Sequence, residues 1–131
     1  MRSELPFIRS VQCCSPLSIF AVQSAKNLEQ ETGVIVDKRR FRANVYLDLK
    51  SSVAFAENEL VGKSLRIGSK VVVAVLERDP RCMMITLDPD TAEKTPVILK
   101  KVAQAHGGFA GVYGAVLAEG MIRKGDSVKL V

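Results

Sequence analysis

The sequence predicts a mainly β protein, a closed or nearly closed β-barrel with two short peripheral helices. Short runs rich in β-branched residues recur at regular spacing and are separated by turn residues. Only two segments have the composition and the end signals of helices. A chain of 131 residues can bury a core of its own, so we expect a single domain over residues 1–131.

Both predicted helices are marked by their ends. Helix-forming residues over Val22–Thr32 are followed by Gly33, a common C-terminal stop. The second helix begins at Thr95-Pro96, a capping residue type followed by a proline in the first helical position, and stops at Gly107-Gly108. His106 lies at the end of this helix, where we interpret it as complementing the helix dipole rather than as a catalytic base.

The predicted strands alternate with turns along the rest of the chain. Apolar and polar residues alternate over Phe41–Leu49, which predicts a strand with one polar face. Further strands are predicted over residues Ser64–Ile67, Val71–Leu76, Cys82–Leu87, Val112–Leu117, Met121–Ile122 and Ser127–Leu130. The turn Gly68-Ser69-Lys70 joins two of them as a hairpin.

Composition narrows the class of protein. A formal net charge of +5 favours anionic ligands, whereas an aromatic content of 5% without tryptophan argues against a single-strand nucleic-acid binder. The longest uncharged run, Ser10–Ala25, contains Pro16 and is too short for a membrane span, so we expect neither a signal peptide nor a membrane segment. Three cysteines do not make a disulfide framework, which favours a reducing, cytoplasmic setting.

Cys82 is the residue that most suggests chemistry. A thiolate is a soft metal ligand or a sulfur nucleophile, and the adjacent Arg81 would favour the anionic form or hold an anionic ligand. An isolated cysteine in an apolar strand is equally well interpreted as a small buried hydrophobic residue. In a regular strand Arg81 faces away from Cys82, so either a bulge at Pro80 turns Arg81 toward the thiol or Arg81 is structural.

A second group of candidates lies on the predicted strand Phe41–Leu49. Arg40, Arg42 and Asn44 share its polar face by their period of two. Paired arginines present donors suited to a phosphate, although a solvated strand face is the alternative. Thr86 or Asp88 could hold the ligand-binding side chains in place without touching the ligand, but the segment Asp88–Thr91 is equally typical of a turn.

Several segments, in order along the chain, resemble the MOSC family, the domain found at the C-terminus of molybdenum cofactor sulfurases. The signature-like segment is Asp79–Thr91. The other similar segments are Ser15–Ser18, Ser24–Leu28, Arg39–Tyr46, Leu60–Gly68, Gly111–Gly120 and Lys124–Val128. The resemblance therefore runs from about Ser15 to Val131. It departs from the family at Ala43, where proline is usual, and at Cys13-Cys14, where a polar pair is common.

The resemblance implies a MOSC-type barrel, similar to the β-barrel of pyruvate kinase, that binds the molybdenum cofactor through its anionic pterin. It implies Cys82 as the molybdenum ligand and reactive, catalytic thiol. The cofactor-binding residues it implies are Arg40, Arg42, Asn44, Arg81, Thr86 and Asp88.

The function so implied is that of a sulfur or cofactor carrier, or of an oxidoreductase component that meets a redox or sulfur-transfer partner protein. Pyridoxal phosphate belongs to a separate domain in the founding members, so we do not expect it in this chain. The alternatives are a basic small barrel that binds nucleic acid, and a domain that keeps the fold and binds a partner without catalysis.

Overall fold

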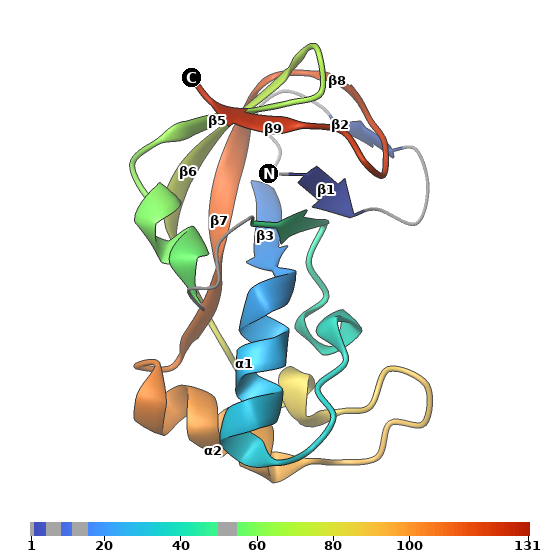
Figure 1. Ribbon diagram of the computed structural model, residues 1–131, viewed down its shortest axis with the longest axis vertical. Coiled ribbons are helices and arrows are strands. Elements are labelled where there is room, and N and C mark those ends of the chain that lie inside the picture. Colours follow the sequence, from blue (N-terminus) through green and yellow to red (C-terminus); the bar gives the residue numbers. More distant parts are fainter. Residues whose placement is uncertain (1, 5–8, 12–15, 50–54) are drawn as a thin grey trace.

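The structure, a computed structural model, describes residues 2–4, 9–11, 16–49 and 55–131. A curled sheet forms a half-barrel at one end of the molecule, and two helices lie together at the other end (Figure 1). The predicted fold class, mainly β with two helices, is therefore confirmed. No helix in the described part is long and apolar enough to cross a membrane.

Within the described residues, seven strands form the main sheet and two further strands form a separate pair. The order across the sheet is β1 (Arg2–Glu4), β4 (Val45–Asp48), β3 (Pro16–Ala21), β7 (Phe109–Ala118), β6 (Val71–Pro80), β5 (Ser64–Ile67) and β9 (Val128–Leu130). Strand β2 (Arg9–Val11) pairs with β8 (Gly120–Ile122). All these pairs are antiparallel except β3 with β4, which run parallel.

The core has two parts, one inside the curled sheet and one between the sheet and the helices. The first is aliphatic and includes Ile19, Val45, Leu47, Leu65, Ile67, Val73 and Val116. The second includes Phe20, Leu28, Phe41, Ile85, Ile98 and Val102. Phe20 and Phe41 stack with their ring centroids 4.1 Å apart, which joins β3 to the segment before β4.

Both predicted helices are present. Helix α1 covers Val22–Thr32, and Gly33 ends it with φ of 72° and a bond from its N–H to the oxygen of Glu29. Helix α2 covers Pro96–Ala105, but the Thr95 side chain makes no capping hydrogen bond. His106 is the residue at its C-terminal end; its imidazole stacks on Phe55 and its Nε2 lies 2.7 Å from the Glu31 carboxylate.

Helix α1 is capped from elsewhere in the chain. Its N-terminal residue Ala21 has no side chain that can cap, and its first turn contains no acidic residue. Instead the buried carboxylate of Glu57, on the short helix η2 (Ala56–Leu60), accepts a hydrogen bond from the Ser24 hydroxyl at 2.9 Å and one from the Ala21 N–H. Acceptor oxygens at this end of the helix are favourable because the N–H groups there lack partners within the helix.

The predicted strand Phe41–Leu49 is wrong in its first half. Residues Lys38–Phe41 form a 3-10 helix, η1, and Arg42 follows with φ of 51°, a left-handed conformation that breaks any strand. Only Val45–Asp48 pair as β4. Arg40, Arg42 and Asn44 therefore do not share one strand face, because Arg40 lies on the helix and is buried.

The predicted strand Cys82–Leu87 is also wrong, since Met83–Thr86 form the 3-10 helix η3. The Thr86 hydroxyl donates to the oxygen of Met83 at 2.6 Å. The buried guanidinium of Arg40 donates to the oxygen of Thr86 at 2.9 Å. In a strand, the backbone oxygen of Thr86 would accept a hydrogen bond from a neighbouring strand. Here it accepts from Arg40 instead, which stabilises the helical turn.

The long antiparallel pair β6–β7 is irregular at three points. Its register shifts between Val72 and Val73, between Val75 and Glu77, and between Arg78 and Pro80. Each shift means that one strand has an extra residue relative to its partner. Such β-bulges bend a strand and change the direction of its side chains. The last shift lies directly before Arg81 and Cys82, so the chain leaves the sheet where the candidate site begins.

Candidate functional site

A cavity of about 190 Å³ lies where the end of β6 meets η1 and η3. Its lining residues are Ser18, Arg40, Phe41, Arg42, Asp79, Pro80, Arg81, Cys82, Met84, Ile85 and Tyr113. Cys82, Arg81, Arg40 and Arg42, all predicted from the sequence, therefore meet around one cavity. They come from two segments about forty residues apart, which the fold brings together.

The thiol of Cys82 is exposed, so the interpretation of Cys82 as a small buried hydrophobic residue is wrong. Cys82 directly precedes η3 and its side chain makes no capping bond to that helix. The neighbouring side chains of Met83 and Met84 are also exposed. Cys13 and Cys14 lie outside the described residues.

Arg81 is held by three groups around its guanidinium. Nε donates to the backbone oxygen of Ala110 at 2.7 Å, and Nη1 donates to that of Phe41 at 2.8 Å. Nη2 lies 2.9 Å from the Asp79 carboxylate, as an ion pair without a well-aligned hydrogen bond. Both alternatives for Arg81 find support, because it lines the cavity together with Cys82 and its guanidinium also holds two backbone oxygens of neighbouring segments.

Gly111 makes room for this arginine. Its φ is 87°, and a Cβ atom at this position would lie 3.0 Å from Nη2 of Arg81 and 2.8 Å from the backbone oxygen of Ile19. The contact with the Ile19 oxygen is closer than a Cβ atom tolerates, and the contact with Nη2 of Arg81 is tight. The backbone of β7 can therefore approach β3 and Arg81 this closely because residue 111 has no side chain.

Asp79 and Tyr113 complete the same wall. Asp79 is 2% exposed, and this burial raises its pKa, although the Arg81 guanidinium opposes the shift. Burial lowers the pKa of Arg81 in turn. The negative charge of the Asp79 carboxylate, together with partial burial, raises the pKa of Tyr113. Burying the Asp79–Arg81 ion pair costs free energy, but the pair fixes the orientation of the Arg81 side chain.

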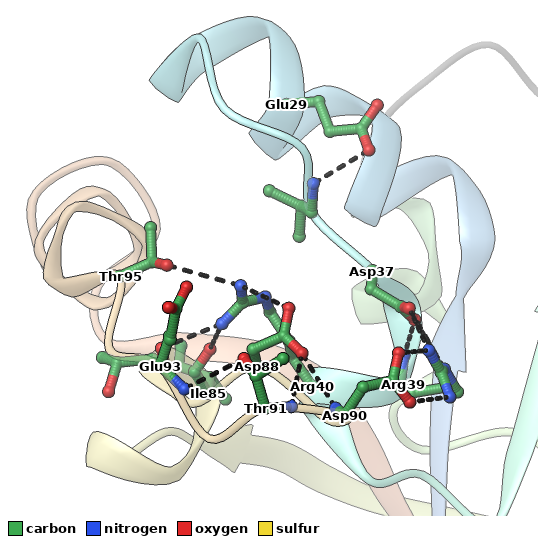
Figure 2. A network of polar contacts seen from close by, with 12 residues as sticks. Glu29, Asp37, Arg39, Arg40, Ile85, Asp88, Asp90, Thr91, Glu93 and Thr95 are labelled. Atoms are coloured by element: carbon green, nitrogen blue, oxygen red, sulfur yellow. Dashed lines mark hydrogen bonds and ion pairs between the residues drawn. The ribbon is translucent and has the colours of Figure 1, made fainter.

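Arg40 enters the cavity from η1 and is 6% exposed. Figure 2 shows its guanidinium reaching the backbone of η3 and the hydroxyl of Thr95, with Asp88 nearby. The ion pair with the Asp88 carboxylate is 3.7 Å long. Its Nε–H meets no acceptor among the described residues, although the atom is buried.

Thr86 and Asp88 lie behind Arg40 and not at the cavity. Thr86 offers its backbone oxygen to Arg40, while the Asp88 carboxylate accepts the N–H groups of Asp90 and Thr91 at 2.8 and 3.0 Å. These two bonds lower the pKa of Asp88. The segment therefore has the turn chemistry that the sequence suggested, and it also carries a carboxylate toward Arg40.

A second ion-pair cluster closes the same loop. Arg39 bonds both Asp37 and Asp90, at 2.8 and 2.9 Å, which fastens the loop after η3 to η1 (Figure 2). Arg39 itself does not line the cavity.

Arg42 and Asn44 have different places. Arg42 is exposed at the edge of the cavity. Asn44 does not line it, but its Oδ1 accepts from the backbone N–H of Ser18 at 2.8 Å and thereby holds Ser18 against the cavity. Asn44 is thus a supporting residue rather than a direct one.

Among the lining residues with polar side chains, the sequence reasoning missed three: Ser18, Asp79 and Tyr113. Asp79 stands inside the signature-like segment, which was the one available signal. Ser18 and Tyr113 come from β3 and β7, which are neighbours only in the folded sheet.

In the described residues, no group of three His, Cys, Asp or Glu side chains comes together to hold a metal ion. A metal in the Cys82 cavity would have this thiol as its candidate protein ligand.

Solved structures share the fold of this chain. YiiM from Geobacillus stearothermophilus matches with a TM-score of 0.72 at 19% identity, over 97% of this chain and 62% of that one. YiiM from Escherichia coli matches with a TM-score of 0.58 at 15% identity, over 100% of this chain and 70% of that one. The chain thus spans less than two thirds of the Geobacillus protein. No curated protein matches the sequence.

The sequence model of the MOSC domain matches residues 8–129, which is nearly the whole chain and begins slightly before the predicted resemblance. This family is associated with functions related to the molybdenum cofactor. The match covers η1, the end of β6 and η3, which carry the arginines and the cysteine of the cavity. The chain belongs to the MOSC domain family.

Proposed function

We propose that the Cys82 cavity binds the molybdenum cofactor, and that the protein acts as a sulfur or cofactor carrier or as an oxidoreductase component. The observation that carries the proposal is an exposed thiol in a cavity lined by three arginines, Arg40, Arg42 and Arg81. A thiolate is a ligand for a soft metal, and guanidinium groups bind anions through several donors at once. Family membership supports this cofactor class.

The donor groups of the cavity fit an anionic cofactor. Arg40 is buried and its Nε–H has no acceptor in the described part of the chain. Nη2 of Arg81 has an ion-pair partner in Asp79 but no aligned hydrogen bond. Buried donors without acceptors cost free energy, and an anionic ligand would remove that cost.

The size of the cavity sets how much of a cofactor it can enclose. At about 190 Å³ it is smaller than the roughly 300 to 1,000 Å³ usual for sites that enclose a small organic ligand. One end of the cofactor would fit, and the remainder would lie outside the cavity. We therefore propose that a redox or sulfur-transfer partner protein covers the bound cofactor.

Each residue has a role in this proposal. The cofactor, when bound, would supply the redox-active metal and its sulfur chemistry. Cys82 would provide the thiolate for the metal or for sulfur transfer, and Arg40, Arg42 and Arg81 would hold the anionic part. The Asp79 carboxylate would keep Arg81 in place through their ion pair.

The test is the metal content of protein purified from a host that makes the cofactor. We expect molybdenum and phosphorus near one equivalent per chain in the wild type, and loss of molybdenum in Cys82→Ser. Arg66→Ala, on the exposed side of β5 and far from the cavity, is the matched control and should retain both elements. Wild-type protein without molybdenum, or with nucleic acid bound instead, would overturn the proposal.

A further inference from the structure

The Cys82 cavity has two kinds of lining groups, which come from two parts of the chain. Soft, polarisable sulfur comes from the segment around η3, as the thiol of Cys82 and the thioether of Met84. Cationic donors come from Arg40 and Arg42, on η1 and directly after it, and from Arg81. The cavity is therefore suited to a ligand that has a soft atom as well as an anionic group.

Charge and unused donors point to an anion beside this thiol. Among the described residues, the charged side chains that line the cavity are three arginines and one carboxylate, that of Asp79. Arg40 is 6% exposed, and its Nε–H has no acceptor in the described part of the chain. Nη2 of Arg81 is also buried and makes no aligned hydrogen bond there. An anion in the cavity would accept from these donors and offset the excess positive charge.

The volume of the cavity limits which ligands it can enclose completely. At about 190 Å³ it is smaller than the roughly 300 to 1,000 Å³ of sites that enclose a small organic ligand. One end of the cofactor would fit, whereas an inorganic anion of a few non-hydrogen atoms would fit whole. Because Cys82 is exposed, such an anion can reach its thiol from solvent.

We propose that the cavity also binds small oxyanions with an outer sulfur atom, of which thiosulfate is the simplest, and that Cys82 takes this sulfur from them. The arginines hold the oxygens of the anion, and its soft outer sulfur lies toward Cys82 and Met84. The inference rests on the proposed role of the protein as a sulfur carrier and names the donor that loads it. Loading then needs no second protein.

The transfer is a displacement at sulfur. The Cys82 thiolate attacks the outer sulfur of thiosulfate, a bond forms between Sγ and this sulfur, and the bond to the central sulfur breaks. The electron pair of the broken bond leaves with sulfite, so Cys82 becomes a persulfide anion and no outside oxidant or reductant takes part. Negative charge moves from the thiolate to the departing sulfite, where the arginine donors stabilise it. The persulfide stays accessible to an acceptor, because Cys82 is exposed.

The test uses cofactor-free protein, purified from a host that does not make the cofactor and incubated with excess thiosulfate. We expect Cys82 to gain the mass of one sulfur atom, with release of about one equivalent of sulfite per chain. Intact mass and peptide mapping locate the sulfur, and cyanide should then remove it as thiocyanate and allow repeated turnover. Cys82→Ser should take up no sulfur. Sulfur on Cys13 or Cys14 instead of Cys82, or no gain of mass, would overturn the proposal.

Arg42→Ala separates binding of the oxyanion from reactivity of the thiol. With cyanide as acceptor, its kcat/KM for thiosulfate should fall by about ten- to a hundredfold, the effect of one charge-assisted contact. Its alkylation by neutral iodoacetamide should stay within about threefold of the wild-type rate, because the lost charge is exposed and screened. Arg66→Ala, outside the cavity on β5, is the matched control and should behave as the wild type in both reactions.

An equal loss of both rates in Arg42→Ala would show that this arginine acts on the thiol, and it would overturn the proposed binding of an oxyanion. An unchanged rate with thiosulfate would overturn it as well. If this variant does not fold, the gain of sulfur at Cys82 in the wild type decides. Molybdenum retention by a protein that takes no sulfur from thiosulfate would overturn only this inference. Sulfur loading of Cys82 in a protein that retains no molybdenum would overturn only the proposed cofactor binding.

Discussion

The guanidinium of Arg81 lies 5.3 Å from the centre of the Phe41 ring and also donates a hydrogen bond to the backbone oxygen of Phe41 at 2.8 Å. One residue ends η1 and the other follows β6, so this contact joins the two segments that line the cavity. The ring face attracts the cation, and the carbonyl fixes its plane. The positive side of the cavity is thereby built before any ligand binds.

Arg42→Ala should weaken cofactor retention without weakening the fold. A charge-assisted arginine contact contributes about 1.5 to 3 kcal/mol, so binding should fall roughly ten- to a hundredfold. The side chain is exposed, so the free energy of unfolding should change by no more than about 0.5 kcal/mol. Molybdenum content after dialysis and urea unfolding measure the two effects. Unaltered retention would remove Arg42 from the site.

Arg42→Gly provides a companion variant because residue 42 has φ of 51°. Glycine adopts this conformation without strain, so this variant should be about 1 kcal/mol more stable than Arg42→Ala. Both variants lack the guanidinium and should lose the cofactor equally. If Arg42→Gly retained more cofactor than Arg42→Ala, in line with its higher stability, residue 42 would act through the stability of the fold and not through its charge.

Cys82 should be the cysteine that reacts fastest in the folded, cofactor-free protein. Its thiol is exposed and close to the Arg81 guanidinium, which is the setting of a reactive cysteine. Alkylation with peptide mapping compares it with Cys13 and Cys14. The free energy of unfolding of Cys82→Ala should lie within about 0.5 kcal/mol of the wild-type value, because the Cys82 side chain makes no capping hydrogen bond to η3. Labelling of Cys82 only after denaturation would contradict this prediction.

Arg40→Met should destabilise the protein by about 3 kcal/mol. The change keeps most of the side-chain volume but removes the donors to the carbonyl of Thr86 and the hydroxyl of Thr95. Each buried polar group left without a partner costs about 1 to 3 kcal/mol. Urea unfolding against Arg42→Ala, an exposed arginine of the same cavity, isolates the effect of burial. Similar stabilities for the two variants would show that Arg40 does not hold η3.

Glu57→Gln should change how stability depends on pH. Burial raises the pKa of Glu57, so the folded state keeps its proton to a higher pH than the unfolded state does. The contribution of Glu57 is therefore fully present below its ordinary pKa of 4.5 and is lost as pH rises through the raised value. Relative to Glu57→Gln, the wild type should lose stability over that range.

Urea unfolding of both proteins between pH 4 and pH 8 measures this difference. Glutamine keeps one acceptor oxygen but has an NH2 donor in place of the other, so one of the bonds from the Ser24 hydroxyl and the Ala21 N–H at the start of α1 should be lost, and the variant should be less stable at low pH by about 1 kcal/mol. A constant difference at every pH would show that Glu57 titrates normally.

Turnover by this chain alone should be slight, even with the cofactor bound. The cavity is small, so much of the cofactor would stay in water, which weakens fixed electrostatic stabilisation. Benzamidoxime reduction with an artificial electron donor is the assay. Sustained turnover without any added protein would show that the small domain is a complete catalytic unit.

The sequence predicts those elements whose signals are local. Helix α1 ends at Gly33 as expected, and the strands β5 and β6 flank their predicted turn. The predictions are wrong at η1 and η3, where apolar alternation and an apolar run suggested strands, and the strands β1, β2 and β3 were not predicted. The conformation of these two segments depends on the buried Arg40 side chain, which bonds the backbone oxygen of Thr86, forty-six residues along the chain. A pattern of neighbouring residues cannot predict such a contact.

The candidate site shows the same division. Cys82 and its arginines were predicted because their residue types suggest chemistry, even though their proposed shared strand face does not exist. Ser18 and Tyr113 were missed because only the pairing of β3 with β7 brings them together. Asp79 carries a signal in the sequence, but its burial beside Arg81 depends on the irregular end of β6.

The three register shifts of the β6–β7 strand pair limit how this site can be transferred to another scaffold. A regular pair of strands given the side chains of Asp79, Arg81 and Tyr113 would place them by strict alternation and would lack the backbone offset at residue 111. A designer would have to transplant the inserted residues of both strands together with Gly111, and only then exchange side chains. Directed evolution by point substitution alone, which leaves strand length unchanged, would not assemble this cavity on an ordinary hairpin.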